Sequence, residues 1–225
     1  MRVGGNICLV PTLDIQGHLD TPLSQTGLEQ ARLVAKHLAA TQFTLAVSSD
    51  LLRALKTGET IRDMNPSFKE IEVWKVARER SFGEMEGQGV DVMLGAVKGK
   101  NKDQIFTWGP AGGETGEQFR GRVRQFVKDL GKRVSKLEGG GVPRVLVTTH
   151  GGFIKDFNML MVDEFSCSMP GKNGEWGRIC PNTGVSRYNV VLDKEGGIKK
   201  AVCTELHYKG HLEGAEYNEP VLYGV

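Results

Sequence analysis

Apolar residues recur along the chain at two spacings, and the order of the spacings predicts strands and helices in turn. Residues 7–10 form a short apolar run that suits a buried strand and ends at Pro11. Residues 43–47 suit a second strand, and the segment between the two strands carries an apolar face at the helical period. That helix is predicted to begin at Thr26, because Glu29 three residues later completes a capping box.

The same alternation continues to the end of the chain. A further helix is predicted through about residue 61, a third strand within residues 71–76, and a long amphipathic helix over residues 119–134. Residues 145–149 are β-branched and apolar, which favours a central strand, and residues 185–192 and 198–206 suggest a terminal hairpin. This β-α order predicts an α/β fold with a mostly parallel sheet, helices on both of its faces and a C-terminal hairpin.

Length and composition bound the class of protein. A chain of 225 residues favours a single domain over residues 1–225, with residues 88–110 interpreted as an excursion over the sheet. The hydrophobic share of 39% and the net charge of +2 exclude wholesale disorder and favour neither nucleic acid nor a membrane surface as partner. The four cysteines are scattered, no apolar run could span a bilayer, and no secretory leader is recognisable. We therefore expect a cytoplasmic protein with free thiols.

Candidate chemistry lies where three predicted strands end, since ligands of open α/β sheets bind at the carboxyl ends of the strands. Arg53 follows the second strand near the start of a helix, where a guanidinium can clamp a phosphate. Glu79 follows the third strand between two arginines, and a surface ion pair is the alternative interpretation. His150 lies between a strand and two glycines, and a structural histidine is the alternative there.

Seven stretches of the chain resemble the histidine phosphatase superfamily in family order. They are QGHLDTPLSQTGLEQA, SSDLLRALKT, ARERSFGEMEG, GGETGEQFRGR, VLVTTHGG, PNTGVS and CTELHYKGHLEG, which run from residue 16 to residue 214. The PNTG and HLEG segments favour the fructose-2,6-bisphosphatase-like members over the phosphoglycerate mutases. The resemblance implies the phosphoglycerate mutase-like form of the α/β fold.

The resemblance also implies roles for individual residues. Family enzymes pass a phosphoryl group to a histidine and then to water, while a glutamate protonates the departing oxygen. Glu79 matches that glutamate, and His150 matches a second histidine that holds the phosphoryl oxygens. The positions that match the rest of the phosphate pocket are Arg53, Gln16, Gly17 and Gly151. The implied substrate is fructose-2,6-bisphosphate or a similar small phosphorylated metabolite, with no metal and no other cofactor.

One family feature is missing from this sequence. The nucleophilic histidine belongs to an Arg-His-Gly block after the first strand, but here Val10 is followed by Pro11 and the rest of a shorter loop. The histidine nearest in sequence, His18, is interpreted as a polar loop residue. Because loss of a covalent nucleophile removes many orders of magnitude in rate, we expect little phosphatase activity from this chain.

Several hypotheses stay open at this point. The sequence could come from a variant transcript or a faulty gene prediction of an active enzyme, or it could be a pseudoenzyme that binds phosphosugars or a protein partner. A phosphoglycerate mutase relative is a third alternative. A nucleotide-binding Rossmann protein is the most distant, because no G-x-G-x-x-G motif follows the first strand.

Overall fold

The computed structural model describes residues 14–138, 141–171 and 174–214. The predicted strand at residues 7–10 and the junction of Val10 with Pro11 lie outside them. A parallel three-stranded sheet is built from β1 (Leu45–Ser48), β2 (Glu72–Val73) and β3 (Val145–Thr148), in the order β2-β1-β3. β1 and β3 pair in register from Leu45 opposite Val145 to Ser48 opposite Thr148.

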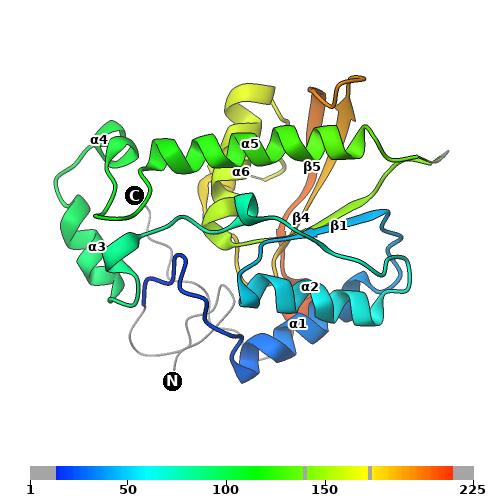
Figure 1. The fold of residues 1–225 in the computed structure, drawn as a ribbon, viewed down its shortest axis with the longest axis horizontal. Helices are drawn as coiled ribbons and strands as arrows, with labels where there is room; N and C mark the ends of the chain where they lie inside the picture. Colours follow the sequence, from blue (N-terminus) through cyan, green and yellow to red (C-terminus); the bar gives the residue numbers. More distant parts are fainter. Residues whose placement is uncertain (1–13, 139–140, 172–173, 215–225) are drawn as a thin grey trace.

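Helices cover both faces of this sheet, as predicted (Figure 1). On one face, α1 (Gln25–Leu38) and α2 (Leu52–Met64) pack against Ala46 of β1 and Leu146 of β3. On the other face, α5 (Gly116–Val134) and α6 (Gly151–Phe165) pack against Leu45 and Val47 of β1. Successive residues of a strand point to opposite faces, so the continuous apolar runs of β1 and β3 serve both layers.

The C-terminal hairpin is confirmed. β4 (Val185–Leu192) and β5 (Ile198–Tyr208) pair antiparallel, and the short turn η4 (Gly210–Leu212) that follows them contacts α1. Met161 of α6 packs with Ala201 and Cys203 of β5 in a small apolar cluster. In the part of the chain that the structure describes, no helix is long and apolar enough to cross a membrane.

Two short helices, α3 (Val90–Val97) and α4 (Lys102–Thr107), occupy most of the segment for which the sequence showed no firm period. They lie at one end of the sheet in Figure 1, and α4 contacts α5. Just before them, the chain pairs with the first described residues. The backbone N–H of Ile15 donates to the carbonyl of Gln88 at 2.8 Å, and Asp14 forms an isolated bridge with Gly89.

The structure corrects one detail of the sequence analysis and adds two about the elements around the sheet. α1 is capped by Ser24, whose Oγ accepts the N–H of Gly27 at 3.0 Å, so Thr26 lies inside the first turn and is not the cap. α2 begins at Leu52 without a side-chain cap, although Ser48, Ser49 and Asp50 precede it. Among the described residues, β1 lies between β2 and β3.

Candidate active site

The carboxyl ends of the three parallel strands bring the sequence-predicted residues to one edge of the sheet. β1 leads into α2, which carries Arg53 in its first turn, and β3 leads through His150 into Gly151 at the start of α6. Glu79 follows β2 and reaches α6, where its Oε2 accepts the N–H of Gly152 at 2.8 Å. Two crossover helices and one loop thus converge on a single cluster, as parallel topology requires.

The carboxylate of Glu79 is held by backbone donors. Besides the Gly152 N–H, its Oε1 accepts the N–H of Arg80 at 2.9 Å. A Cβ on residue 152 would lie 2.4 Å from Oε1, so glycine is needed for this approach. Burial raises the pKa of Glu79, although the two N–H groups and the charges of Arg53 and Arg122 oppose that rise. A carboxyl with a raised pKa suits proton donation.

The ion-pair alternative for Glu79 is not what the structure shows. The Arg78 guanidinium pairs with Asp50 through two contacts, Nε to Oδ1 at 2.7 Å and Nη2 to Oδ2 at 2.6 Å. Arg80 donates from Nη2 to the carbonyls of Trp108 and Glu114, both at 2.9 Å. The guanidinium groups of both neighbouring arginines therefore bind partners other than the Glu79 carboxylate.

His150 is buried, with 1% of its surface exposed. Its Nε2 lies 2.8 Å from the hydroxyl oxygen of Ser49, and its Nδ1 has no partner among the described residues. Burial is the main cause that lowers the pKa of His150 well below its usual value, and the nearby charges of Arg53 and Arg122 act in the same direction. The imidazole is therefore neutral at neutral pH.

Arg53 is buried and binds the loop that precedes α1. Its Nη2 donates to the carbonyl of Gly17 and its Nη1 to the carbonyl of Leu19, both at 2.7 Å. Gly17 has a positive φ of 49°, and a Cβ there would lie 2.3 Å from the carboxylate of Glu86. Within the same turn, the carbonyl of Gln16 accepts the N–H of Leu19 at 2.8 Å. Arg53 thus brings Gln16 and Gly17 to the sheet edge.

One residue of this site, Arg122, was missed by the sequence analysis. Arg122 of α5 pairs with Glu114 through two contacts, Nε to Oε1 at 2.8 Å and Nη2 to Oε2 at 2.6 Å. It also donates to the carbonyls of Val76, Arg78 and Glu79, at 3.1, 2.6 and 2.8 Å. Arg122 therefore fixes the backbone that carries Glu79. The stretch GGETGEQFRGR contains both partners, but only the fold shows what Arg122 reaches.

His18, which the sequence analysis interprets as a polar loop residue, contacts the backbone of Glu79. Its Nε2 is 2.8 Å from the carbonyl oxygen of Glu79, and because a carbonyl only accepts, this ring nitrogen donates. Its own backbone N–H donates to Oε1 of Glu86 at 2.9 Å. The histidines His37 and His211 instead stack together near the C-terminal hairpin, with ring centroids 5.5 Å apart.

Comparisons with known proteins agree with this geometry. A family profile described as the histidine phosphatase superfamily (branch 1) matches residues 11–191. The chain is 29% identical to a Danio rerio protein named fructose-2,6-bisphosphatase TIGAR B, over 88% of this chain and 90% of that protein. It is 34% identical to putative phosphoserine phosphatase 2 of Hydrogenobacter thermophilus, over 90% of this chain and 85% of that protein.

A solved structure gives the same fold independently. The native structure of mycobacterial glucosyl-3-phosphoglycerate phosphatase matches with a TM-score of 0.72 at 23% identity, covering 92% of this chain and 96% of that one. This likeness confirms the predicted α/β architecture. The profile match over most of the chain establishes the family. The chain belongs to the histidine phosphatase superfamily (branch 1).

Proposed function

We propose that this chain binds a phosphorylated sugar, fructose-2,6-bisphosphate or a similar monoester, at the edge occupied by Glu79 and His150. One observation carries the proposal: the Glu79 carboxylate accepts a hydrogen bond from the Gly152 N–H at the start of α6. Arg53 and His150, both buried, belong to the same cluster. A helix N-terminus and a buried cation favour a phosphate there. Relatives named as phosphatases of sugar phosphates support the choice of ligand.

Each residue has a role in this proposal. Glu79 protonates the leaving oxygen, for which its raised pKa is suited. In the tautomer that carries its hydrogen on Nδ1, His150 accepts the Ser49 hydroxyl at Nε2 and offers the Nδ1–H to a phosphoryl oxygen. Arg53 contributes positive charge as it holds the loop of Gln16 and Gly17. Gly151, the first residue of α6, lines the proposed phosphate pocket next to His150.

The proposal includes weak or absent turnover. No Arg-His-Gly occurs in the sequence, and the position after Val10 where the resemblance expects the nucleophile holds Pro11. Positioning and electrostatics alone leave only a residual fraction of a covalent enzyme's rate. The family reaction, hydrolysis of a phosphate monoester, then needs a residue that this chain lacks.

Restoring the missing block tests the enzymatic part of the proposal. We would insert Arg-His-Gly-Glu-Thr between Val10 and Pro11 and measure phosphate release from fructose-2,6-bisphosphate. The matched control carries Arg-Ala-Gly-Glu-Thr at the same place, with the same length and charge. The proposal expects release only from the histidine-bearing insert. Equal release from the unmodified chain and the histidine insert would contradict it.

The binding part of the proposal has its own test, because the cluster around Glu79 is assembled although the block is absent from the sequence. Calorimetry of the unmodified chain with fructose-2,6-bisphosphate, and with fructose as the phosphate-free control, addresses it. Heat of binding from the phosphorylated sugar alone supports a binding protein. No heat from either sugar up to millimolar concentration would exclude this ligand class. Reading the gene across the junction of Val10 and Pro11 separately tests whether the block was lost from the transcript.

A further inference from the structure

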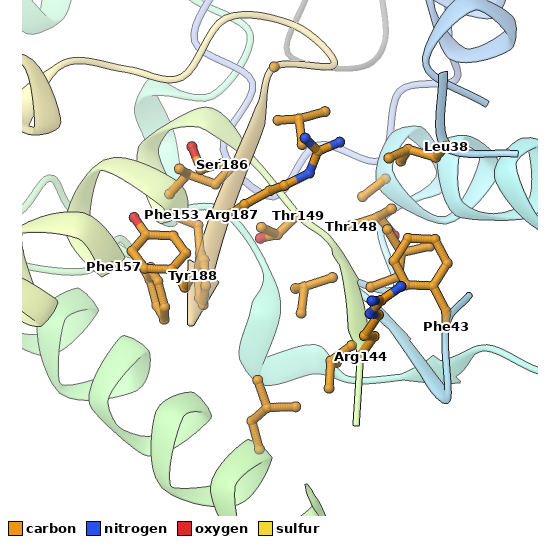
Figure 2. Close-up of a pocket in the computed structure, with 18 of the residues that line it drawn as sticks. Leu38, Phe43, Arg144, Thr148, Thr149, Phe153, Phe157, Ser186, Arg187 and Tyr188 are labelled. Atoms are coloured by element: carbon orange, nitrogen blue, oxygen red, sulfur yellow. The ribbon is translucent and has the colours of Figure 1, made fainter. Parts of the chain in front are cut away.

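Part of the site is held by regular secondary structure. Arg53 and His150 line a cavity whose wall includes side chains of β3 and β4, and Figure 2 shows Thr148 and Tyr188 from these two strands. β3 pairs with β1, and β4 pairs with β5. The backbone hydrogen bonds of these strand pairs therefore fix this part of the site.

The other part of the site consists of two loops. Residues 15–19 form one of them, and residues 79–88 form the other, which contains only the short turn η2 (Gly83–Met85). Among the described residues, backbone–backbone bonds join these loops only at Ile15. Its N–H donates to the carbonyl of Gln88 at 2.8 Å, and its carbonyl accepts the N–H of residue 87 at 2.7 Å. Side chains must therefore hold the loops together nearer to residue 79.

Glu86 supplies such a bond between the two loops. Its Oε1 accepts the backbone N–H of His18 at 2.9 Å and that of Phe82 at 2.8 Å. The hydroxyl of Ser81 also donates to this oxygen, at 3.4 Å. A bond from a backbone N–H to a carboxylate is about twice as strong as a bond between neutral groups. One carboxylate oxygen thus binds donors from both loops.

The loop of Gln16 and Gly17 is shaped around this carboxylate. Gly17 has a φ of 49°, and a Cβ on it would lie 2.3 Å from Oε1 of Glu86, so glycine permits the close approach. The carbonyl of the same residue accepts Nη2 of Arg53 at 2.7 Å. Glu86 and Arg53 together therefore fix the position of this loop.

His18 extends the connection to Glu79. Its Nε2 donates to the carbonyl of Glu79 at 2.8 Å, and its backbone N–H is the one that Glu86 accepts. Loss of the Glu86 acceptor would therefore loosen the bond between the His18 ring and Glu79 as well. The position of Glu79 relative to the loop of residues 15–19 depends on Glu86, although the two carboxylates do not share a donor.

We propose that Glu86 is a positioning residue of the phosphate site, which holds the loop of Gln16 and Gly17 in place relative to Glu79 without touching the ligand. This inference rests on the proposed function, because the role it assigns is in phosphate binding. The role requires an acceptor oxygen at this place. The negative charge of Glu86 instead disfavours a bound anion, because like charges repel. The reach and the charge of this side chain therefore have opposite effects on binding.

Two substitutions separate reach from charge. Glu86→Gln keeps a carbonyl oxygen at the same reach and removes the charge, so we expect fructose-2,6-bisphosphate to bind at least as tightly as to the unmodified chain. Glu86→Asp keeps the charge but shortens the side chain by one methylene, so we expect the dissociation constant to rise about 10-fold. The matched control is Glu84→Ala, which removes an exposed carboxylate from η2 and is expected to change the constant by less than about twofold. Calorimetry measures all three.

The outcomes distinguish this inference from the proposed function. No heat from the unmodified chain up to millimolar sugar would overturn the proposed function, and the role of Glu86 with it. If the unmodified chain binds the sugar, two results would overturn the role of Glu86 alone. One is equal dissociation constants in the unmodified chain, Glu86→Gln and Glu86→Asp, and the other is a weaker Glu86→Gln beside an unchanged Glu86→Asp.

Amide hydrogen exchange tests the role in the unmodified chain, and it decides the question if a variant does not fold. A chain in which Glu86 has released its donors would not bind the ligand. Exchange of the His18 and Phe82 N–H groups is therefore expected to slow about 10-fold when the sugar is present at about ten times its dissociation constant. The control is the N–H of Gly197, which donates to the Asp193 carboxylate at 2.8 Å in the hairpin turn and is expected to exchange at an unchanged rate. Exchange at His18 and Phe82 that the bound sugar does not slow would overturn the role of Glu86.

Discussion

At the scale of single residues, the Glu79 carboxyl can take its position because residue 152 is a glycine and has no Cβ. Gly152 has no Cβ, and this lets its N–H approach the Glu79 Oε2 to 2.8 Å at the start of α6. The two backbone donors hold the carboxyl in place while burial raises its pKa. The position of the Glu79 carboxyl therefore depends on the backbone at the start of α6 as much as on the side chain itself.

Substitution of Gly152 by alanine tests this dependence. The new Cβ would lie 2.4 Å from Glu79 Oε1 and displace the carboxyl, so we expect the free energy of unfolding to fall by about 1–3 kcal/mol. Gly121→Ala is the matched control, because its Cβ meets nothing within 4 Å and α5 gains helix propensity, worth about 1 kcal/mol. Denaturant unfolding of both variants gives the comparison, and equal stability changes would contradict the account.

The helix start at Ser24 shows where residue-level prediction from sequence fails. Ser24 and Thr26 both carry a hydroxyl that can cap, and the later one also had Glu29 in capping-box position. Which hydroxyl caps the helix depends on the position of the preceding loop, and tertiary contacts determine that position. By contrast, Glu79 and His150 were singled out from sequence because each follows an apolar run that predicts a strand, although the strand before Glu79 is only Glu72–Val73 and is not buried.

Paired substitutions at the two hydroxyls decide which one caps α1. Ser24→Ala removes the acceptor for the Gly27 N–H and is expected to lower the free energy of unfolding by about 1 kcal/mol. Thr26→Ala is expected to change it by much less. Chemical denaturation provides the measurement, and a larger loss from Thr26→Ala would restore the capping box that the sequence suggested.

At the scale of elements, α5 connects the sheet edge to the loop that carries Glu79. Arg122 ties this helix to three backbone carbonyls and to Glu114, whose Oε2 also accepts the N–H of Ser81 at 2.8 Å. Sequence periodicity predicted α5 as an amphipathic helix, but it could not show which groups the Arg122 side chain binds. Its three carbonyl partners lie 43 to 46 residues away in the chain, so only the assembled fold identifies them.

Removal of this link is expected to be costly. Arg122→Ala removes the cation that pairs with the Glu114 carboxylate and the side-chain donor to three carbonyls, and we expect a loss of about 3 kcal/mol in the free energy of unfolding. Arg124→Ala on the same helix removes only the exposed pair with Glu164, for which about 0.5 kcal/mol is expected. Equal losses in thermal or denaturant unfolding would show that Arg122 is an ordinary surface arginine.

At the scale of the whole molecule, the sequence predicted the α/β architecture but only some of the residues that form the site. The β-α alternation and the period of each apolar run predict a parallel sheet with helices on both faces, because these faces must be buried. The strand ends then locate the site. The loop of residues 14–19 was not predictable in the same way, because its position depends on long-range bonds from Arg53 and Glu86.

Stability of the whole molecule is expected to depend on pH through its histidines. Burial lowers the pKa of His150, and lowers the pKa of His207 and His211 to about 4. Between their ordinary pKa and these lower values, the unfolded chain binds protons that the folded chain does not. The free energy of unfolding therefore falls as pH decreases from about 7 to about 5, although the raised pKa of Glu79 partly opposes this fall.

The substitution His211→Gln tests the sign and the source of this dependence. It is expected to reduce the slope of unfolding free energy against pH by about one proton near pH 5.5. Denaturant titrations at a series of pH values measure both slopes. A slope that is unchanged in the variant, or a stability that rises on acidification, would contradict the burial argument for this residue.

The claim that most depends on the whole account is that this chain retains a phosphate site without the atom that accepts the phosphoryl group. The direct measurement is acid-labile, alkali-stable phosphate on the chain, sought by mass spectrometry after rapid quenching with fructose-2,6-bisphosphate. The account predicts none on the unmodified chain and phosphohistidine on the chain with the restored Arg-His-Gly-Glu-Thr block. Phosphohistidine on the unmodified chain, at His18, His150 or any other position, would contradict it.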